Sequence, residues 1–570
     1  MRRTLCIAVA AAGALVLPAA AFAHAALLRT VPQASGIVNT SPKQIELTYS
    51  EAVEPRFAIV SVTDAAAHNE TTGPPRRSPT NPDTLIVPIK HVAEGWYLVY
   101  WRVISVDGHP VRGAFTFAVG PNQGPAPQFV IPSTSETAAT PKLLTARWLV
   151  FLSVMAAIGL AALRLVIARP VIARVSGTTL RAVTIAFGAA SAIGLAAIPI
   201  YTLISTADFA LRSFFSFGAL IPLVRASAFG RSYVDLWICF ALFVAAAALA
   251  IRIDRPERPQ RSLAELVAGI GVVLAAGATL LVPGLAGHAA QTSPRGLSVV
   301  LDWLHLASAS LWIGGLIGLL VLWRSLPGAS RVAGLVVAVP RFSNTAFFSV
   351  LVLIGSGTGA TLLHLPTLAT LWDTSYGQAI LVKIALLLGA MLLASGNLLR
   401  TKPRLARPDV APGAARLLRR LVAGETVLVA AAVFAAAVLS SLAPPSKALA
   451  SVGGASAHVG PGRVSRTVTK NGYTFGVVVS PNKAALPNSF AVKITRHGQP
   501  VTGADVVLTF EMLDMEMGNQ AYKLDETSPG VYARPATPAL VMVGHWGLSF
   551  NVTPRGGTPF NVLLVDKANG

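Results

Sequence analysis

The stretch LSVVLDWLHLASASLWIGGLIGLLVLW, at residues 297–323, decides the fold of this chain. It carries only two side chains that titrate, Asp302 and His305, and its other residues are apolar or small. About 20 such residues in an α-helix are enough to cross the hydrocarbon core of a bilayer. The stretch therefore predicts a transmembrane helix.

Similar apolar segments lie on both sides of this stretch. We count about eight in all, at Leu143–Ile167, Leu180–Leu203, Val234–Ile251, Leu263–Val282, Leu297–Trp323, Phe342–Leu363, Ala379–Asn397 and Leu418–Leu442. The mean hydropathy of the whole chain is +0.61 and only 12% of its residues are charged, about half the fraction of a soluble protein. We expect a polytopic α-helical membrane protein that is embedded in the lipid bilayer.

The net charge of +21 is concentrated in loops between apolar segments, not along one binding face. One loop holds Arg252, Arg255, Arg258 and Arg261, and another, at residues 400–420, holds seven basic residues. The alternate loops are poorer in basic residues: the loop at residues 284–296 holds one arginine and the loop at residues 366–378 holds none. The exception is the loop at residues 205–233, which holds three. This asymmetry predicts that the basic loops are cytoplasmic, and it excludes a nucleic-acid partner. Both ends of the bundle are then expected outside the cytoplasm.

The N-terminal residues are typical of an exported protein. Residues 1–23 combine Arg2 and Arg3, an apolar run and an Ala-Phe-Ala site, which predicts a signal peptide cleaved after Ala23. His24 would then offer an α-amine and an imidazole nitrogen to one metal ion, and Asp107 and His109 add a carboxylate and a second imidazole. Nitrogen and oxygen donors of this kind suit Cu(II).

The number and positions of the cysteines argue against disulfide bonds and against metal binding by thiolates. The chain has two, Cys6 within the predicted signal peptide and Cys239 within an apolar segment. A disulfide framework and a thiolate metal site are therefore not expected.

Both ends of the mature chain have the pattern of β domains. Residues 44–49, 57–62, 84–89, 96–103 and 114–119 alternate polar and apolar side chains, and so do segments beyond residue 473. Pro- and Gly-rich turns separate them, which favours two antiparallel sandwiches of immunoglobulin-like or cupredoxin-like type. Residues 121–141, rich in Pro, Gly, Ser and Thr, are expected to form a linker.

The first β region resembles the periplasmic copper-binding protein family CopC. The resemblance rests on His24, on TYSEAVEP at residues 48–55 and on YWRVISVDGHP at residues 100–110. It implies that His24, Asp107 and His109 bind Cu(II). Some members also have a methionine-rich Cu(I) site, which is not expected here because this region has no methionine.

The bundle resembles CopD, the membrane partner of CopC. The matching residues are GHAA at 287–290, DWLHLA at 302–307, LWIGG at 311–315, YGQAILVK at 376–383 and Glu425. The order of the regions is that of a CopC–CopD fusion, as in YcnJ-like copper uptake and resistance proteins.

The last β region resembles the YtkA-like periplasmic domain. VTGADV at residues 501–506, Met515, Met517 and the Gly-His-Trp of residues 544–546 carry this resemblance. Met515, Met517 and His545 are a candidate copper site, because thioethers suit Cu(I), although methionine is more often a core residue. We divide the chain into residues 1–23 (signal peptide), 24–120 (CopC-like), 121–141 (linker), 142–444 (CopD-like bundle) and 445–570 (YtkA-like).

Ionisable groups at membrane depth are costly and are therefore candidates for function. His288, His305 and His364 are expected at the outer side of the bundle, with Asp302 one turn before His305 to orient its ring. With Glu425 near the inner side, hydrogen-bonded by Asn397, they form a candidate copper path.

Each of these residues also has a structural alternative. His288 and His364 can be interfacial residues in water, and His305 a buried histidine satisfied by Asp302 or Ser308. Lys383 lies near the outer face, where the alternative to a functional role is snorkelling to the interface. Position along the helices does not decide whether the three histidines converge.

The sequence therefore predicts a non-enzymatic copper protein of the cytoplasmic membrane, with both soluble domains on the periplasmic or extracellular side. It would capture Cu(II) outside and mediate copper import, homeostasis or resistance, with copper as its only cofactor and periplasmic copper chaperones as partners. The chain contains no Gly-x-x-x-x-Gly-Lys-Ser/Thr motif, which argues against a primary pump. The alternatives are a b-type haem oxidoreductase and a copper sensor or chaperone without transport.

Overall fold

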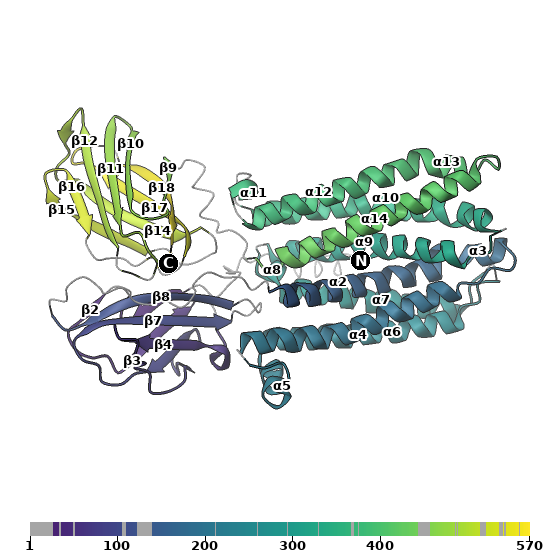
Figure 1. The fold of residues 1–570 in the computed structure, drawn as a ribbon, viewed down its shortest axis with the longest axis horizontal. Helices are drawn as coiled ribbons and strands as arrows, with labels where there is room; N and C mark the ends of the chain where they lie inside the picture. Colours follow the sequence, from purple (N-terminus) through teal and green to yellow (C-terminus); the bar gives the residue numbers. More distant parts are fainter. Residues whose placement is uncertain are drawn as a thin grey trace, which may run out of the picture. The chain divides into compact units, whose positions relative to one another are not determined.

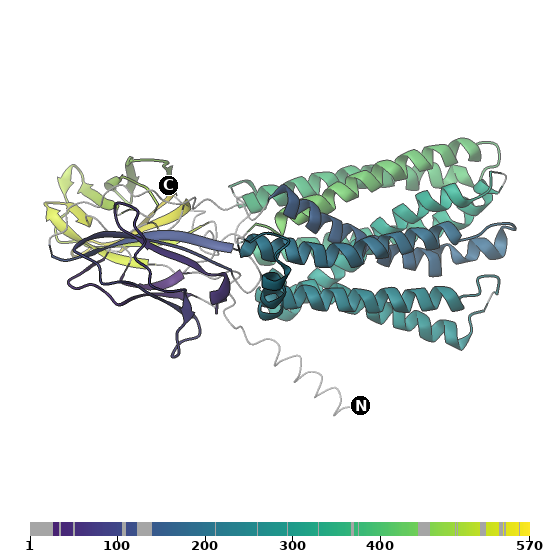
Figure 2. The ribbon, with the colours of Figure 1, turned by 60° about the horizontal axis from the view of Figure 1, so that its bottom comes forward.

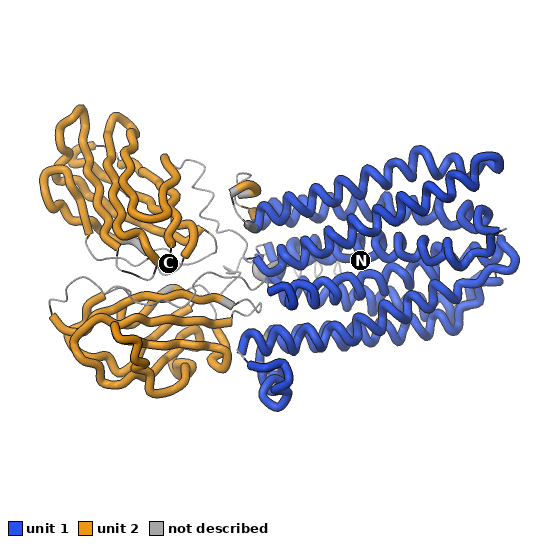
Figure 3. Tube along the Cα trace, viewed as in Figure 1, with its two compact units in different colours: residues 1–21, 139–364, 375–442 blue, residues 22–138, 365–374, 443–570 orange. Residues whose placement is uncertain are grey.

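The computed structural model describes residues 27–33, 36–49, 52–104, 110–121, 140–210, 212–258, 260–292, 294–328, 330–365, 370–373, 375–442, 456–484, 486, 488–513, 520–534, 540, 543–557 and 559–569. They fall into two compact units, coloured separately in Figure 3: one holds the long helices, and the other holds the strands together with the short helix at Thr370–Asp373.

The N-terminal β domain consists of two four-stranded sheets with the orders β1-β3-β6-β5 and β2-β8-β7-β4. Its strands are β1 (Leu27–Val31), β2 (Ile37–Val38), β3 (Gln44–Tyr49), β4 (Ile59–Thr63), β5 (Arg76–Arg77), β6 (Thr84–Pro88), β7 (Gly95–Ile104) and β8 (Pro110–Val119). Tyr49, Trp101 and Phe115 are among its fully buried side chains, and Tyr49 meets Trp101 edge to face. The predicted sandwich is confirmed.

The C-terminal β domain is built from one ten-stranded, almost wholly antiparallel sheet. Its strands are β9 (Ala457–Val459), β10 (Val464–Lys470), β11 (Tyr473–Ser480), β12 (Ser489–Arg496), β13 (Gln499–Pro500), β14 (Asp505–Met512), β15 (Gln520–Ser528), β16 (Val531–Arg534), β17 (Gly544–Thr553) and β18 (Phe560–Ala568). Along β11 every second side chain is buried, as expected for strands that present one face to a core.

Eight helices of the described chain are long and apolar enough to cross a membrane, as the sequence predicts. The helices are α2 (Pro141–Ala162), α3 (Arg169–Arg174), α4 (Arg181–Phe209), α5 (Phe217–Ala226), α6 (Ala228–Ile253), α7 (Leu263–Ala286), α8 (His288–Gln291), α9 (Arg295–Ser325), α10 (Arg331–His364), α11 (Thr370–Asp373), α12 (Ser375–Gly396), α13 (Lys402–Leu405) and α14 (Ala411–Leu439). The long ones run side by side in one bundle (Figures 1 and 2). Short π-helical segments extend α2 at Leu163–Ile167 and α12 at Asn397–Thr401.

Helix α9 lies at the centre of this bundle and packs against α2, α4, α7, α10 and α14. It crosses α2 where Gly314 meets Gly159, so closely that a Cβ built on Gly314 would lie 2.4 Å from the Gly159 Cα. A Cβ on the neighbouring Gly315 would lie 2.1 Å from the Phe342 ring of α10. Small residues allow membrane helices to approach in this way, which explains the two glycines of the LWIGG motif.

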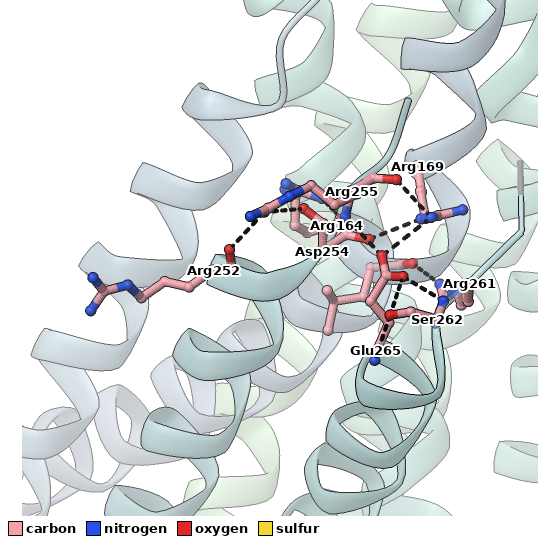
Figure 4. Close-up of polar contacts among 9 residues, drawn as sticks. Arg164, Arg169, Arg252, Asp254, Arg255, Arg261, Ser262 and Glu265 are labelled. Atoms are coloured by element: carbon pink, nitrogen blue, oxygen red, sulfur yellow. Dashed lines mark hydrogen bonds and ion pairs between the residues drawn. The ribbon is translucent and has the colours of Figure 1, made fainter. Parts of the chain in front are cut away.

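A group of buried ion pairs, here called the arginine cluster, fixes one end of the bundle (Figure 4). Asp254 accepts from Arg164 Nη1 at 2.7 Å and from Arg169 Nε at 2.9 Å. Arg169 also lies 3.5 Å from Glu265, which caps α7 by accepting hydrogen bonds from the backbone and hydroxyl of Ser262. The cluster ties the end of α2 and the start of α3 to the loop between α6 and α7.

Candidate functional site

His305 lies ten residues after the first residue of α9, about 15 Å along a helix that rises about 1.5 Å per residue. Its Nε2 atom is 3.1 Å from Nζ of Lys383 on α12, and its Nδ1 atom is 3.3 Å from Oγ of Ser356 on α10. Side chains from three of the candidate membrane spans therefore meet at one imidazole ring.

The hydrogen bonds assign the proton on this ring. The Ser356 hydroxyl donates to the backbone carbonyl of Val352 at 2.6 Å, so that towards His305 its oxygen can only accept. The His305 Nδ1 atom therefore carries the hydrogen, and Nε2 carries a lone pair. That lone pair accepts the hydrogen bond from the Lys383 ammonium, and it is also the electron pair that a metal ion would use.

Asp302 and Tyr376 complete what we call the His305 cluster, which comprises Asp302, His305, Ser356, Tyr376 and Lys383. Asp302 precedes His305 by one turn of α9, and its carboxylate interacts electrostatically with Lys383 and with Tyr376. The side-chain partners of the His305 ring are Ser356 and Lys383, which corrects the expectation that Asp302 or Ser308 satisfies it. Ser308 donates instead to the backbone carbonyls of Leu304 and His305.

Two glycines make room for this cluster. A Cβ on Gly357 of α10 would lie 3.1 Å from the His305 Cε1 atom, and a Cβ on Gly284 of α7 would lie 3.0 Å from the Asp302 carboxylate. Both contacts are tighter than an ordinary van der Waals contact, so a larger residue would push the functional side chain aside. Three helices, α7, α10 and α12, thus contact the Asp302–His305 turn of α9.

Lys383 and Ser356 are the residues whose role the sequence did not reveal. Lys383 lies eight residues, about 12 Å, from the first residue of α12, and its place near the outer face stays a prediction. Its side chain turns to His305, in contrast to the snorkelling alternative. The seven-residue spacing of Tyr376 and Lys383, which places both on one helix face, was the available signal.

His364 ends α10 with both ring nitrogens engaged. Its Nδ1 atom donates to the Ala360 carbonyl at 2.7 Å, and its Nε2 atom accepts from the Thr292 hydroxyl at 3.1 Å. His288 opens the short helix α8, and its side chain lies outside the described residues. That His288, His305 and His364 together form an entry site for copper therefore stays a prediction.

Glu425 is buried in α14 and accepts a hydrogen bond from the side-chain amide of Asn397, as the sequence predicted. Thr401 in turn donates to Asn397 at 3.2 Å. Helix α14 begins at Ala411, seven residues before the predicted apolar segment, and the position of Glu425 near the inner side stays a prediction. Glu425 lies 14 residues from either end of the helix, so it is near its middle, about 21 Å along.

The predicted sites in the β domains are for the most part beyond the described residues. His24, Asp107 and His109 lie outside them, and so do Met515 and Met517. His545 is described, in β17, opposite Lys567 of β18. Within the residues that the structure describes, no group of three or more His, Cys, Asp or Glu side chains could hold a metal ion.

One buried acid lies next to that histidine. Asp566 is fully buried in β18 and accepts a hydrogen bond from the Asn482 amide at 2.8 Å. Burial raises the pKa of Asp566 to about 6, with the Asn482 hydrogen bond and the nearby His545 acting in the opposite direction.

Comparison with protein families matches three regions of this chain. Residues 27–120 match the CopC domain, residues 336–439 match Copper resistance protein D, and residues 467–550 match the YtkA-like family. The second region contains Ser356, Lys383 and Glu425, whereas Asp302 and His305 precede it.

Individual relatives cover the chain to different extents. The copper transport protein CutJ of Bacillus subtilis (strain 168) is 27% identical over 563 residues, which is 96% of both chains. Protein YobA of Escherichia coli (strain K12) is 38% identical over 17% of this chain and 80% of its own length. Copper resistance protein C of Escherichia coli is 33% identical over 19% of this chain and 91% of its own length.

Proposed function

The chain belongs to the copper transport and resistance proteins built from CopC and CopD domains, and from that membership we propose that it captures Cu(II) outside the cytoplasm and passes copper inward through its helical bundle.

The observation that carries this proposal is the lone pair of His305 Nε2 at a meeting point of α9, α10 and α12. A titratable side chain in a membrane-spanning helix is costly and is kept where it serves an ion path. Imidazole nitrogen is a good ligand for copper, and Ser356 holds the ring in the tautomer that leaves Nε2 free of hydrogen. Asp302, one turn outward, supplies the negative charge that attracts a cation.

The remaining candidate residues fit copper-binding positions that come before and after His305 along the proposed path. His24, Asp107 and His109 are the proposed capture ligands for Cu(II), loaded from solution or by a periplasmic copper chaperone. His364 lies at the predicted outer end of α10 and precedes His305 on the path. Glu425, near the middle of α14 with Asn397 as its donor, is the next polar group toward the cytoplasm.

The test is copper-64 accumulation in cells that express full-length protein or its His305→Ala variant, normalised to folded protein. We expect accumulation to fall to the level of cells without the protein, while Cu(II) binding by the N-terminal domain is retained. His91→Ala, an exposed histidine of that domain, is the control and should accumulate copper normally. Equal accumulation in wild type and His305→Ala would contradict the proposal.

Purified protein distinguishes the proposed function from that of an electron-transfer enzyme. A b-type haem protein would show a Soret absorption band after purification, and a copper carrier would not.

A further inference from the structure

We propose that Lys383 is a tethered cation that occupies the His305–Asp302 position whenever cargo is absent, and that this position takes a monovalent cation, copper(I). This inference rests on the proposed function and adds the charge of the cargo and the means of its release. It includes one redox step: Cu(II) released by the N-terminal domain accepts one electron from an extracytoplasmic thiol, which is oxidised toward its disulfide, and reaches His305 as Cu(I).

The geometry makes the ammonium and a metal ion mutually exclusive at His305. Lys383 Nζ lies 3.1 Å from Nε2 and uses its lone pair, because the Nδ1 hydrogen is held by Ser356. A metal bound to imidazole would lie about 2.0–2.1 Å from the same nitrogen, in the same direction. One lone pair cannot serve both, so the ammonium must leave before copper can bind.

The charges of the cluster select the cargo. Asp302 precedes His305 by one turn of α9, and its carboxylate interacts electrostatically with the Lys383 ammonium, so one negative charge is balanced by one positive charge. An additional charge in a medium of low dielectric is strongly unfavourable, so a cation that enters beside Lys383 is opposed by the ammonium. Exchange of the ammonium for Cu(I) keeps the local charge unchanged, whereas exchange for Cu(II) would add one positive charge. The cluster is therefore matched to a monovalent ion.

Lys383 also has room to leave. Helix α12 is peripheral, with only 11% of its apolar segment buried inside the protein. The lysine side chain has a flexible four-carbon stem, and Lys383 lies about 12 Å from the first residue of α12, close enough for its ammonium to move outward along the helix. When the ammonium returns to His305 it displaces copper, so Lys383 both excludes other cations and drives release.

The experiment measures Cu(I) binding to the purified full-length protein by competition with bicinchoninate, in wild type and Lys383→Met. We expect Lys383→Met to bind one further Cu(I) per chain at least about tenfold more tightly, since copper no longer breaks a charge-assisted hydrogen bond. Any Cu(I) sites in the β domains contribute equally to both proteins. Copper-64 accumulation by this variant should fall at least about tenfold, since nothing displaces the bound ion.

Three variants make the result specific to the cation at His305. Lys383→Arg keeps a cation and should bind Cu(I) as weakly as wild type, and His305→Ala added to Lys383→Met should remove the gain. Lys402→Met, which replaces a lysine bonded to Asn344 outside the cluster, should leave binding and accumulation unchanged. If Lys383→Met does not fold, Lys383→Gln, neutral and of similar length, carries the same expectation.

Cu(I) binding by the neutral variants that is equal to or weaker than wild type overturns the inference. A gain that persists after His305→Ala overturns it as well, because the site would then lie elsewhere. These outcomes differ from failure of the proposed function, in which His305→Ala accumulates copper like wild type. If His305→Ala loses accumulation and Lys383→Met shows no gain, only the inference fails.

Discussion

The arginine cluster and the His305 cluster are both groups of buried ionisable side chains in one bundle, yet their charges are satisfied differently. In the arginine cluster, Asp254 receives hydrogen bonds from two guanidinium groups, and Glu265 receives them from backbone and hydroxyl groups as well (Figure 4). In the His305 cluster, one ammonium contacts the lone pair of the imidazole and is also the cation that interacts electrostatically with Asp302.

The difference separates a structural cluster from one that can exchange its cation. Guanidinium groups that bind carboxylates through several fixed hydrogen bonds lose little freedom and leave no open position. A single lysine on a flexible stem can be replaced by another cation without breaking a network. We therefore expect changes in the arginine cluster to affect folding, and changes around His305 to affect copper movement.

The largest expected effect is that of Asp254→Ala. The change leaves Arg164 and Arg169 buried without their shared carboxylate, which costs about 3–5 kcal/mol for a buried pair that loses one partner. We expect a large loss of folded protein, measured as the monodisperse fraction in detergent and as the midpoint of thermal unfolding.

The matched control is Glu257→Ala, in the same loop but exposed, which should change stability by less than about 0.5 kcal/mol. Copper accumulation per folded Asp254→Ala protein should stay near the wild-type value. If accumulation per folded protein were lost while stability was retained, the division between the two clusters would be wrong.

Asp566 extends the comparison, because it is a buried acid that, unlike Asp254, has no guanidinium partner among its described contacts. The folded-state pKa of Asp566, at about 6, is above the usual value of 3.8, so the native C-terminal domain holds a proton that the unfolded chain has lost between these values. The contribution of Asp566 to stability is therefore complete below about pH 4 and decreases as the pH rises through 6, by at most about 3 kcal/mol.

Hydrogen exchange at the β18 amides of the full-length protein, followed from pH 4 to 7 and corrected for intrinsic exchange, measures this dependence. Asp566→Asn should flatten it, because the amide does not titrate. A native profile without a decrease between pH 4 and 6, or one that Asp566→Asn leaves unchanged, would contradict the assignment.

The smallest expected effect comes from a single methyl group beside His305. Gly357→Ala places a Cβ 3.1 Å from the His305 ring, so the ring must shift by a few tenths of an ångström from Ser356 or Lys383. Small misplacements of functional groups reduce rates, and we expect copper-64 accumulation to fall about threefold.

Gly355→Ala provides the control on the same helix, because a Cβ there meets nothing within 4 Å. Both changes replace glycine by alanine in a helix and share the gain in helix propensity of about 1 kcal/mol. Equal accumulation in the two variants would mean that the position of the His305 ring is not critical.

The sequence by itself determined the architecture. Eight long apolar runs predict eight helices, because a segment that crosses a bilayer must satisfy its own backbone and be apolar along its length. Alternation in segments such as residues 44–49 predicts the β domains for a similar reason, since one face of a strand meets the core. Asp302, His305 and Glu425 were recognised because ionisable groups within such runs are rare. The pairing of Asn397 with Glu425 was predicted from similar depth alone and is confirmed.

Only the tertiary structure decided which of these residues act together. His305 meets a serine 51 residues later and a lysine 78 residues later, and Arg164 meets Asp254 90 residues later. Hydropathy and spacing report the face and depth of a residue on its own helix, but the rotation and contacts of neighbouring helices determine which faces meet. The start of α14 differs from the predicted one for a related reason, because the helix continues through a basic segment that hydropathy alone does not count as helix. Local pattern therefore fixes the elements, and packing between helices fixes the chemistry at His305.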